Sequence, residues 1–563
     1  MSWLQNLRKD PKKVKALICA TIIMVVAAIL CAIQPLYSGD IDNYGMALVA
    51  NKRFAGAGQD GYIYYLHPIL CKIFEVVHWM FPKADAFSLV AETMLLMGIW
   101  WISYYLYVKK KNNIELLVEY LVLFSFILIG NLFNDNFTRW AAFFCMIGML
   151  TLLCNNTKKK SYCFVGTFYV ALGMMWRQEV LIIYIPFLLL MFLAELIQKQ
   201  KTERMPFLKQ TIGQILVPLI CIVVLLGCKI YIDHSETYRE AVAYDDARSA
   251  VVDYPSAYYD DVASEMPGVS WNDYYAILNW FFLDTDYINT SLYETIDDAS
   301  SIKPYTLTLP SFKLMLSSLK DKIMTNTHLF YLCVLLGSLL VIGFLAMNWY
   351  YKIEFVLMFL GMDFILLYLT YAGRGIVRAF YPVIYATIIS VVVILKKNDI
   401  ATKAKYKWAG YGVLVLVAFL GIGRGVSAMT ITTDQSVWQA GDDEAAPDWM
   451  ESDRTYVWSC SKWAKTLAQA TYIQEGKLIP EVVMQRNIPE GNWFYGQVFF
   501  DQYLEKIGVD NPIDVVMQED AYYVGDNCLF LLYYLQEHVD YHIQAEQVGD
   551  ILEIPVWDFY VAE

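Results

Sequence analysis

The chain has 563 residues, of which 57% are hydrophobic and only 18% are charged. Soluble globular domains carry about 25% charged residues, so this balance argues against a chain of ordinary soluble domains. The net charge of −13 argues against nucleic acid as a partner, because a phosphate backbone attracts basic surfaces. The excess apolar residues lie in long blocks, which is typical of a membrane protein.

Eleven apolar blocks are candidates for membrane-spanning helices. A helix needs about 20 mostly apolar residues to cross a bilayer core about 30 Å thick. The predicted spans are residues 16–36, 86–107, 114–133, 140–154, 161–176, 180–197, 211–231, 329–347, 353–372, 379–395 and 408–428. The predicted fold class is therefore an α-helical polytopic membrane protein with about 11 transmembrane helices.

Six basic segments lie at the same end of the predicted spans. They are found at positions 8–15, 109–111, 158–160, 199–209, 352 and 396–407. Short loops rich in Lys and Arg remain in the cytoplasm. The pattern therefore predicts a protein of the cell membrane with a cytoplasmic N-terminus and an extracytoplasmic C-terminus.

The segments predicted to face outward are acidic. Residues 429–563 contain 6 basic and 24 acidic residues, and the loop 232–327 contains 6 basic and 16 acidic residues. This charge argues against docking of the outer face on anionic lipid head groups. We divide the chain into a transmembrane domain, 1–428, with outer loops 37–85 and 232–327, and an extracytoplasmic domain, 429–563.

The extracytoplasmic domain alternates strand-like and helix-like runs. Strands are predicted for TYVWSC from Thr455 and IDVVM from Ile513, and helices for FFDQYLEKIG from Phe499 and CLFLLYYLQEHV from Cys528. This order predicts a small α/β domain. In the outer loops, residues 67–81 have the apolar spacing of an amphipathic helix on the membrane surface.

Two carboxylates, Asp40 and Asp42, come immediately after the first predicted span. Ionisable groups are expensive at the edge of a bilayer, so their presence there points to a functional site. They could accept a proton from a hydroxyl, or hold a divalent metal together with phosphate, although the chemistry does not require a metal. The same residues also fit an ordinary solvated turn.

Four arginines, Arg139, Arg177, Arg374 and Arg378, lie at the predicted outer ends of spans, where basic residues are otherwise few. Guanidinium binds phosphate oxygens in two-pronged fashion, so these side chains are candidates for binding a lipid phosphate. The alternative is that they reach the interface or pair with neighbouring acidic residues.

Together these features resemble the GT-C class of membrane glycosyltransferases, and more narrowly a group of polytopic membrane proteins of Gram-positive bacteria. The similar stretches are GDIDNYGMALVANKRFAGAGQDGYIYYLHPILCKIF from Gly39, FTRWAAFFCMIGML from Phe137, MWRQEV from Met175, YDDARSAVVDYP from Tyr244 and WNDYYAILNWFFLD from Trp271. The resemblance implies a GT-C-like fold.

The resemblance also implies roles for the charged residues. An acidic residue of the first outer loop would be the base, so Asp40 or Asp42 takes that role. The family's acidic pair is adjacent, whereas Ile41 separates the two here, so the choice of base stays open. Arg177, Arg374 and Arg378 would bind the lipid phosphate. Weaker candidates, for binding the acceptor, are Asp246, Arg248, Asp253, Trp271 and Asp273.

The expected function is transfer of a sugar from a polyprenyl-phosphate donor to an envelope glycan or lipid acceptor at the outer face of the membrane. The alternative is a non-catalytic envelope protein, or an exporter of lipid or polysaccharide, that uses the same charged groups for binding alone. A polar path through the bilayer that includes Asp363 would favour transport.

Overall fold

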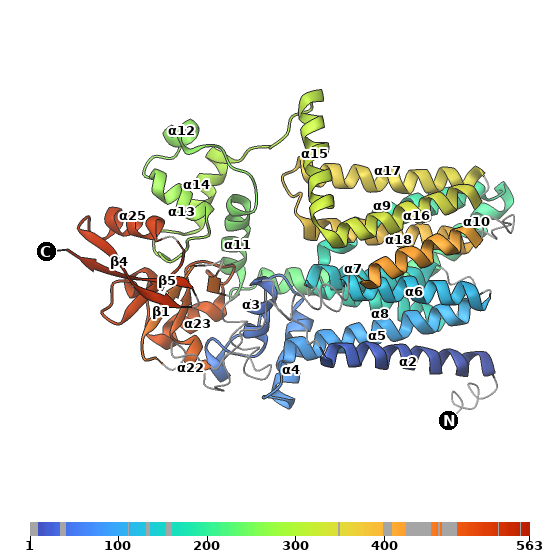
Figure 1. Cartoon of the computed structure of the whole chain (residues 1–563), viewed down its shortest axis with the longest axis horizontal. Helices are drawn as coiled ribbons and strands as arrows, with labels where there is room; N and C mark the ends of the chain where they lie inside the picture. The colour runs from blue at the N-terminus through green and yellow to red at the C-terminus, as the bar shows by residue number, and fades with distance from the viewer. Residues whose placement is uncertain are drawn as a thin grey trace.

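The chain forms a bundle of long helices with a smaller sheet domain at one end of it (Figure 1). The computed structural model describes residues 10–33, 41–110, 112–130, 136–153, 160–346, 349–397, 408–423, 452–459, 462–463, 481–526, 528–551 and 553–562. This architecture is that of a multi-pass helical membrane protein with a small C-terminal α/β domain.

Helices occur in every range that the sequence predicts to span the membrane. They are α2 (Pro11–Ile33), α5 (Ala86–Lys109), α6 (Asn113–Gly130), α7 (Phe137–Leu153), α8 (Lys160–Trp176), α9 (Gln178–Gln198), α10 (Lys201–Asp233), α16 (Thr327–Ala346), α17 (Trp349–Tyr371), α18 (Val377–Lys397) and the helix Trp408–Gly423. Of those described, α2, α5, α9, α10, α16, α17 and α18 are the 7 that are long and apolar enough to cross a membrane. The multi-pass fold is therefore confirmed, and the count of eleven spans stays a prediction.

Helix α7 lies at the centre of the bundle, and its side chains from Phe137 to Thr151 are buried. It packs closely on α8, because glycines stand where the two backbones meet. A Cβ atom at Gly148 would lie 2.7 Å from the carbonyl oxygen of Gly166. Small residues let membrane helices approach closely, and this contact holds α7 against α8.

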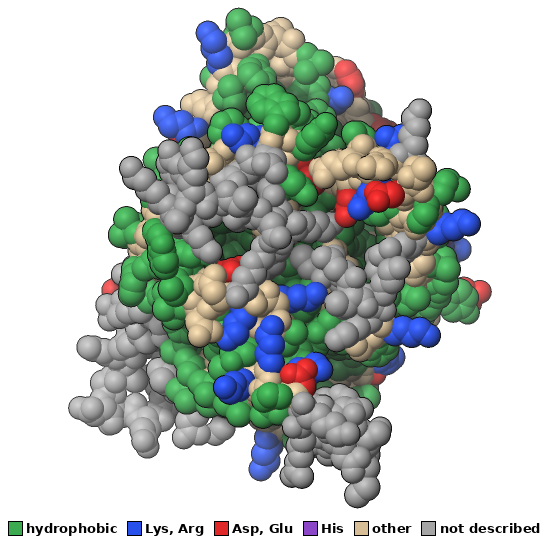
Figure 2. Space-filling model, turned by 90° about the vertical axis from the view of Figure 1, so that its right-hand side faces the viewer, with side chains coloured by type: hydrophobic (Ala, Val, Ile, Leu, Met, Phe, Trp, Pro, Cys, Tyr) green, Lys and Arg blue, Asp and Glu red, His purple; other side chains and the backbone are tan. Residues whose placement is uncertain are grey.

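The N-terminal end of α2 lies at the end of the bundle that is remote from the sheet domain (Figure 1). Figure 2 shows that Lys and Arg side chains gather at this remote end, with fewer Asp and Glu side chains among them. Basic side chains among the described residues are therefore concentrated at this end. That this end faces the cytoplasm stays a prediction.

The segments predicted to face outward form short helices at the end of the bundle that is nearer the sheet domain (Figure 1). They are α3 (Ile41–Ala50), η1 (Gly56–Gly58), α4 (Pro68–Met80), α11 (Arg239–Val252), α12 (Tyr259–Val262), η2 (Ala263–Glu265), α13 (Trp271–Leu278), α14 (Thr290–Ser300) and α15 (Leu309–Thr325). The helix predicted for residues 67–81 is confirmed as α4, in which Leu70 and Phe74 are buried while Trp79 and Met80 are exposed. Its location at the membrane surface stays a prediction.

The C-terminal domain contains a five-stranded sheet of order β2-β1-β3-β5-β4. Its elements are β1 (Thr455–Trp458), α22 (Glu481–Met484), β2 (Asn487–Pro489), α23 (Val498–Ile507), α24 (Pro512–Val515), β3 (Ala521–Val524), α25 (Leu529–His538), β4 (Ile543–Ile551) and β5 (Ile554–Val561). Strand β1 pairs in parallel with β2 and β3, and β5 runs antiparallel to β3 and β4.

The predicted strand at Thr455 and the predicted helices at Phe499 and Cys528 are confirmed as β1, α23 and α25. The predicted strand from Ile513 is wrong, because Pro512–Val515 forms the short helix α24. Pro512 occupies the start of this helix, where its fixed φ is pre-organised and its missing N–H costs nothing. A short apolar run cannot distinguish the two structures.

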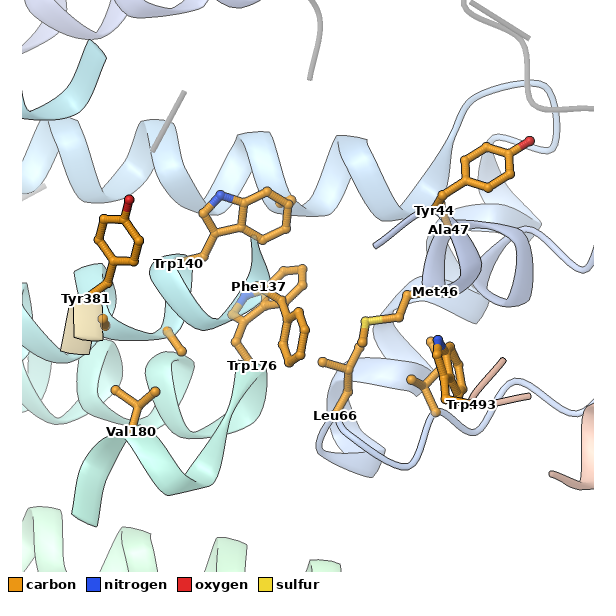
Figure 3. Packing of buried hydrophobic residues seen from close by; sticks show 14 of the residues in the cluster. Tyr44, Met46, Ala47, Leu66, Phe137, Trp140, Trp176, Val180, Tyr381 and Trp493 are labelled. Carbon is orange, nitrogen blue, oxygen red and sulfur yellow. The ribbon is translucent and has the colours of Figure 1, made fainter. Parts of the chain in front are cut away.

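One hydrophobic core runs from the bundle into the C-terminal domain. In Figure 3 Trp140 and Trp176 of the bundle lie on one side, and Trp493 of the C-terminal domain lies on the other, beside Met46 and Leu66 of the first outer loop. The loop also inserts Phe54, which is fully buried, into an aromatic cluster of that domain. Ring centroids 5.1 to 6.4 Å from that of Phe54 belong to Trp463, Phe494, Phe499, Phe500 and Tyr503.

We expect Phe54→Ala to destabilise the attachment of the C-terminal domain by about 3–5 kcal/mol, because truncation of a buried Phe leaves a cavity. The midpoint of thermal unfolding, followed by tryptophan fluorescence in detergent, measures this loss. Phe81→Ala is the matched control, since Phe81 is exposed. An equal midpoint for both variants would contradict the anchoring role of Phe54.

Candidate functional site

Two of the residues predicted from separate outer segments meet in an ion pair. Nη1 of Arg378, at the start of α18, donates to Oδ2 of Asp42, at the start of α3, over 2.5 Å. Both side chains are partly exposed. A cation at a helix N-terminus is unfavourable, and the carboxylate compensates for it. Asp40 lies outside the described residues.

Arg139 has the least compensated charge of the four predicted arginines. It lies in the first turn of α7 with 6% of its surface exposed, and its guanidinium stacks on the ring of Tyr381 at 3.8 Å. Its Nε and Nη1 atoms have no hydrogen-bond partner in the part of the chain that the structure describes. Tyr381 follows Arg378 by three residues, so it lies on the same side of α18. Arg139 is therefore close to the Asp42–Arg378 pair.

The N-terminus of α16 borders Arg139. Oδ1 of Asn326 caps this helix by accepting from the backbone N–H of Leu329 at 3.0 Å, and it also accepts from the Tyr381 hydroxyl at 3.2 Å. His328 lies within electrostatic range of Arg139, and its Nδ1 atom is buried without a partner among the described residues. Helix N-termini attract anions, so an unpaired guanidinium next to one forms an anion-binding arrangement.

The other two arginines are paired, as the alternative reading of the sequence allowed. Nη1 of Arg177 donates to the hydroxyl of Thr138 at 3.0 Å, and its Nε lies 3.4 Å from Glu179. Nη1 of Arg374 donates to Asp253 at 3.1 Å. Thr138 precedes Arg139, so Arg177 still borders the same site, whereas Asp253 holds Arg374 toward α11.

Arg248 on α11 is fully buried and joins the large loop to the first outer loop. It forms an ion pair with Asp245 at 2.5 Å, and its Nη2 donates to the hydroxyl of Tyr65 at 2.9 Å. Burial, together with the charge of Asp245, raises the pKa of the Tyr65 phenol, which therefore stays protonated. Asp246 accepts a hydrogen bond from Tyr64 at 2.6 Å. Two of the predicted residues, Asp246 and Arg248, are thus linked through α11 to the first outer loop.

The C-terminal domain packs against both the first outer loop and the large loop. The ring of Trp493 packs on Tyr65 at a centroid distance of 5.5 Å. Gly491 contacts the carbonyl of Trp280 so closely that a Cβ at this position would overlap that oxygen. Sequence reasoning missed Tyr65, Asp245 and Trp493, because an isolated Tyr, Asp or Trp in a loop carries no signal of its own.

Trp271 and Asp273 take part in a different contact. Trp271 is exposed and packs on Tyr275. Asp273 forms a capping box with Ser270 at the start of α13, and its Oδ1 lies 2.7 Å from Nε2 of His538 on α25. The structure therefore does not bring these two residues to Asp42. It places Asp273 at a junction between the large loop and the C-terminal domain.

A metal could be held at this junction, because ligand atoms of Asp273, Glu537 and His538 lie within 4.8 Å of one another. The oxygens of Asp273, however, are already hydrogen-bonded. Oδ2 accepts from the hydroxyl of Tyr287 at 3.0 Å and from the backbone N–H of Ser270 at 2.9 Å. The junction is accounted for as a hydrogen-bonded contact between the two parts.

Comparison of the chain with family models, with curated proteins and with solved structures finds no match.

We expect the Asp273–His538 contact to weaken as pH rises. The hydrogen bond that Nε2 of His538 donates to Asp273 raises the pKa of His538. The imidazolium therefore adds stability below about pH 6.5, its unfolded value, and that stability is lost as pH passes the raised value. Thermal unfolding should show His538→Gln to be more destabilising at about pH 5.5 than at about pH 9. The exposed His542→Gln is the matched control. A pH-independent difference would rule out the charged pair.

Proposed function

We propose that this protein is a GT-C-like glycosyltransferase, with about eleven spans, that moves a sugar from a polyprenyl-phosphate donor to an envelope glycan or lipid acceptor at the outer face. One observation carries the proposal. Two nitrogens of the buried Arg139, Nε and Nη1, have no hydrogen-bond partner among the described residues, and this side chain lies near the Asp42–Arg378 pair. An uncompensated charge at the end of a membrane helix is costly, and a phosphate ligand supplies the missing counter-charge.

The donor phosphate fits between Arg139 and Arg378. Two guanidinium groups and the N-terminus of α16 provide donors for its oxygens. Polyprenyl chains are apolar, and the bundle offers apolar helix surfaces directly below this level. The proposal therefore accounts for a charged site at the outer ends of α7 and α18.

The base is Asp42. It accepts the proton of an acceptor hydroxyl, the hydroxyl oxygen bonds to the anomeric carbon, and the bond from that carbon to the donor phosphate oxygen breaks. The electron pair of that bond leaves with the lipid phosphate, whose charge Arg139 and Arg378 neutralise. Donor phosphate competes with Asp42 for Arg378, so donor binding restores the basicity of the carboxylate.

A transport function has less support. The most deeply placed carboxylate of the predicted spans, Asp363, is exposed on the surface of α17. A polar path through the bilayer needs its ionisable groups inside the bundle. A non-catalytic binding protein would use the same arginines. It differs from the transferase only because it needs no base.

We expect Asp42→Asn to lower sugar transfer about 10²–10⁴-fold, because an amide cannot accept the proton. The measurement is transfer of radiolabelled sugar from polyprenyl-phosphate donors in membranes. Asp298→Asn, on the exposed side of α14, should leave transfer unchanged. The resemblance allows Asp40 as the base as well, so Asp40→Asn is measured in parallel. Full activity in both variants would contradict the assignment of an acidic residue of the first outer loop as the base.

Arg139→Met should weaken donor binding by about 1.5–3 kcal/mol, the value of a hydrogen bond to a charged group. The same variant should unfold at an equal or higher temperature than the wild type, since removal of an uncompensated buried charge relieves strain. Donor titration and thermal unfolding separate these effects. Arg239→Met removes an exposed outer arginine and serves as control. Unchanged donor binding, or a strong loss of stability, would assign Arg139 a structural role.

A further inference from the structure

The large outer loop divides its charge unevenly along the chain. Residues 301–325 hold four of the loop's 6 basic residues, Lys303, Lys313, Lys320 and Lys322, but only one of its 16 acidic residues, Asp321. The acidity of the loop therefore belongs to its first two thirds. The last segment, which contains α15, is positively charged.

Helix α15 carries an apolar side that no described residue covers. Met315 and Leu319 are buried against the bundle. Leu309, Phe312 and Leu316 recur at helical spacing on another side, and each is exposed, Leu309 to 69%. Lys313 and Lys320 flank this side. The pattern is that of an amphipathic helix with basic residues beside its apolar side.

The position of α15 matches that pattern. Figure 1 shows α15 running across the ends of α16 and α17, nearly at right angles to them, and extending past the flank of the bundle. The end that it crosses is the end nearer the sheet domain. A helix that crosses the ends of spans lies at the level of the lipid head groups.

We propose that α15 is an interfacial helix that binds the outer leaflet of the membrane. Its Leu309–Phe312–Leu316 side enters the boundary between head groups and acyl chains, and Lys313 and Lys320 contact anionic head groups. Two observations select lipid as the occupant: the local positive charge of residues 301–325 and the orientation of α15 across the ends of the spans. Docking on anionic lipid was not expected, because the loop as a whole is acidic. That argument does not hold for residues 301–325, which are positively charged.

The same helix is attached to the turn that carries two of the arginines. Nζ of Lys322 donates to the carbonyl oxygen of Gly375 at 2.5 Å. Gly375 lies in the turn between α17 and α18, next to Arg374 and three residues before Arg378. Contact of α15 with lipid therefore fixes this turn relative to the membrane surface. Any effect of this attachment on sugar transfer rests on the proposed function. The lipid contact of α15 does not depend on that function.

Photo-crosslinking tests the lipid contact in the full chain. Leu316→p-benzoylphenylalanine and Asp321→p-benzoylphenylalanine place the probe at two exposed positions whose directions differ by about 140° around the helix. The chain is reconstituted in nanodiscs of phosphatidylglycerol and phosphatidylcholine in equal amounts, irradiated and analysed by mass spectrometry. We expect phospholipid adducts at position 316 to exceed those at 321 at least about tenfold, as burial on one side requires.

Equal adducts at the two positions, or a cross-link from position 316 to this chain or to a second copy, would overturn the proposal. A second variant, Lys313→Glu with Lys320→Glu, keeps the buried side of α15 intact. It should retain lipid adducts at 316 but lose any excess of phosphatidylglycerol over phosphatidylcholine, and a retained excess would refute the role of the lysines. Sugar transfer is measured on the same samples. Its absence with normal adducts would defeat the transferase alone.

Discussion

The insertion of Phe54 into the aromatic core of the C-terminal domain is the contact on which the arrangement of the outer segments depends. Each aromatic pair in such a cluster adds about 0.5–1.5 kcal/mol beyond its buried area, and Phe54 contacts five rings. The chain between α3 and Tyr65 is thereby held against the sheet domain at one end and against α7 at the other. Asp42 is positioned toward Arg378 by packing that lies well away from either charge.

The apolar blocks and the basic clusters were sufficient to predict the bundle, because a bilayer restricts the length, composition and flanks of its helices. The partners of Asp42 could not be predicted. Arg378 lies 336 residues away, and no local pattern specifies which turns meet at the outer end of a bundle. Tyr65 could not be predicted for the same reason. The error at Ile513 has a different cause, since a four-residue helix that begins with a proline carries too little pattern to separate strand from helix.

The structure also ranks groups that the sequence treated as equivalent. Four arginines at predicted outer span ends had the same claim to a phosphate, but Arg374 is neutralised by Asp253 and Arg177 contacts Glu179. Only burial and the position of counter-charges distinguish Arg139 from them. Unsatisfied charge is destabilising in a folded chain, so a site that retains it has been shaped by something other than stability.

The positions of oppositely charged residues also explain how charge is distributed in the large loop, residues 232–327. Two acidic residues of the loop are paired within the protein, where Asp245 on α11 neutralises Arg248 and Asp253, which follows α11, holds Arg374. Lys313 and Lys320 on α15 have no such carboxylates near them in sequence except Asp321, which points to another side of the helix. Net charge summed over a loop therefore says little about what the loop binds. What decides it is where charges of one sign gather, and the lysines of α15 gather beside an exposed apolar side of that helix.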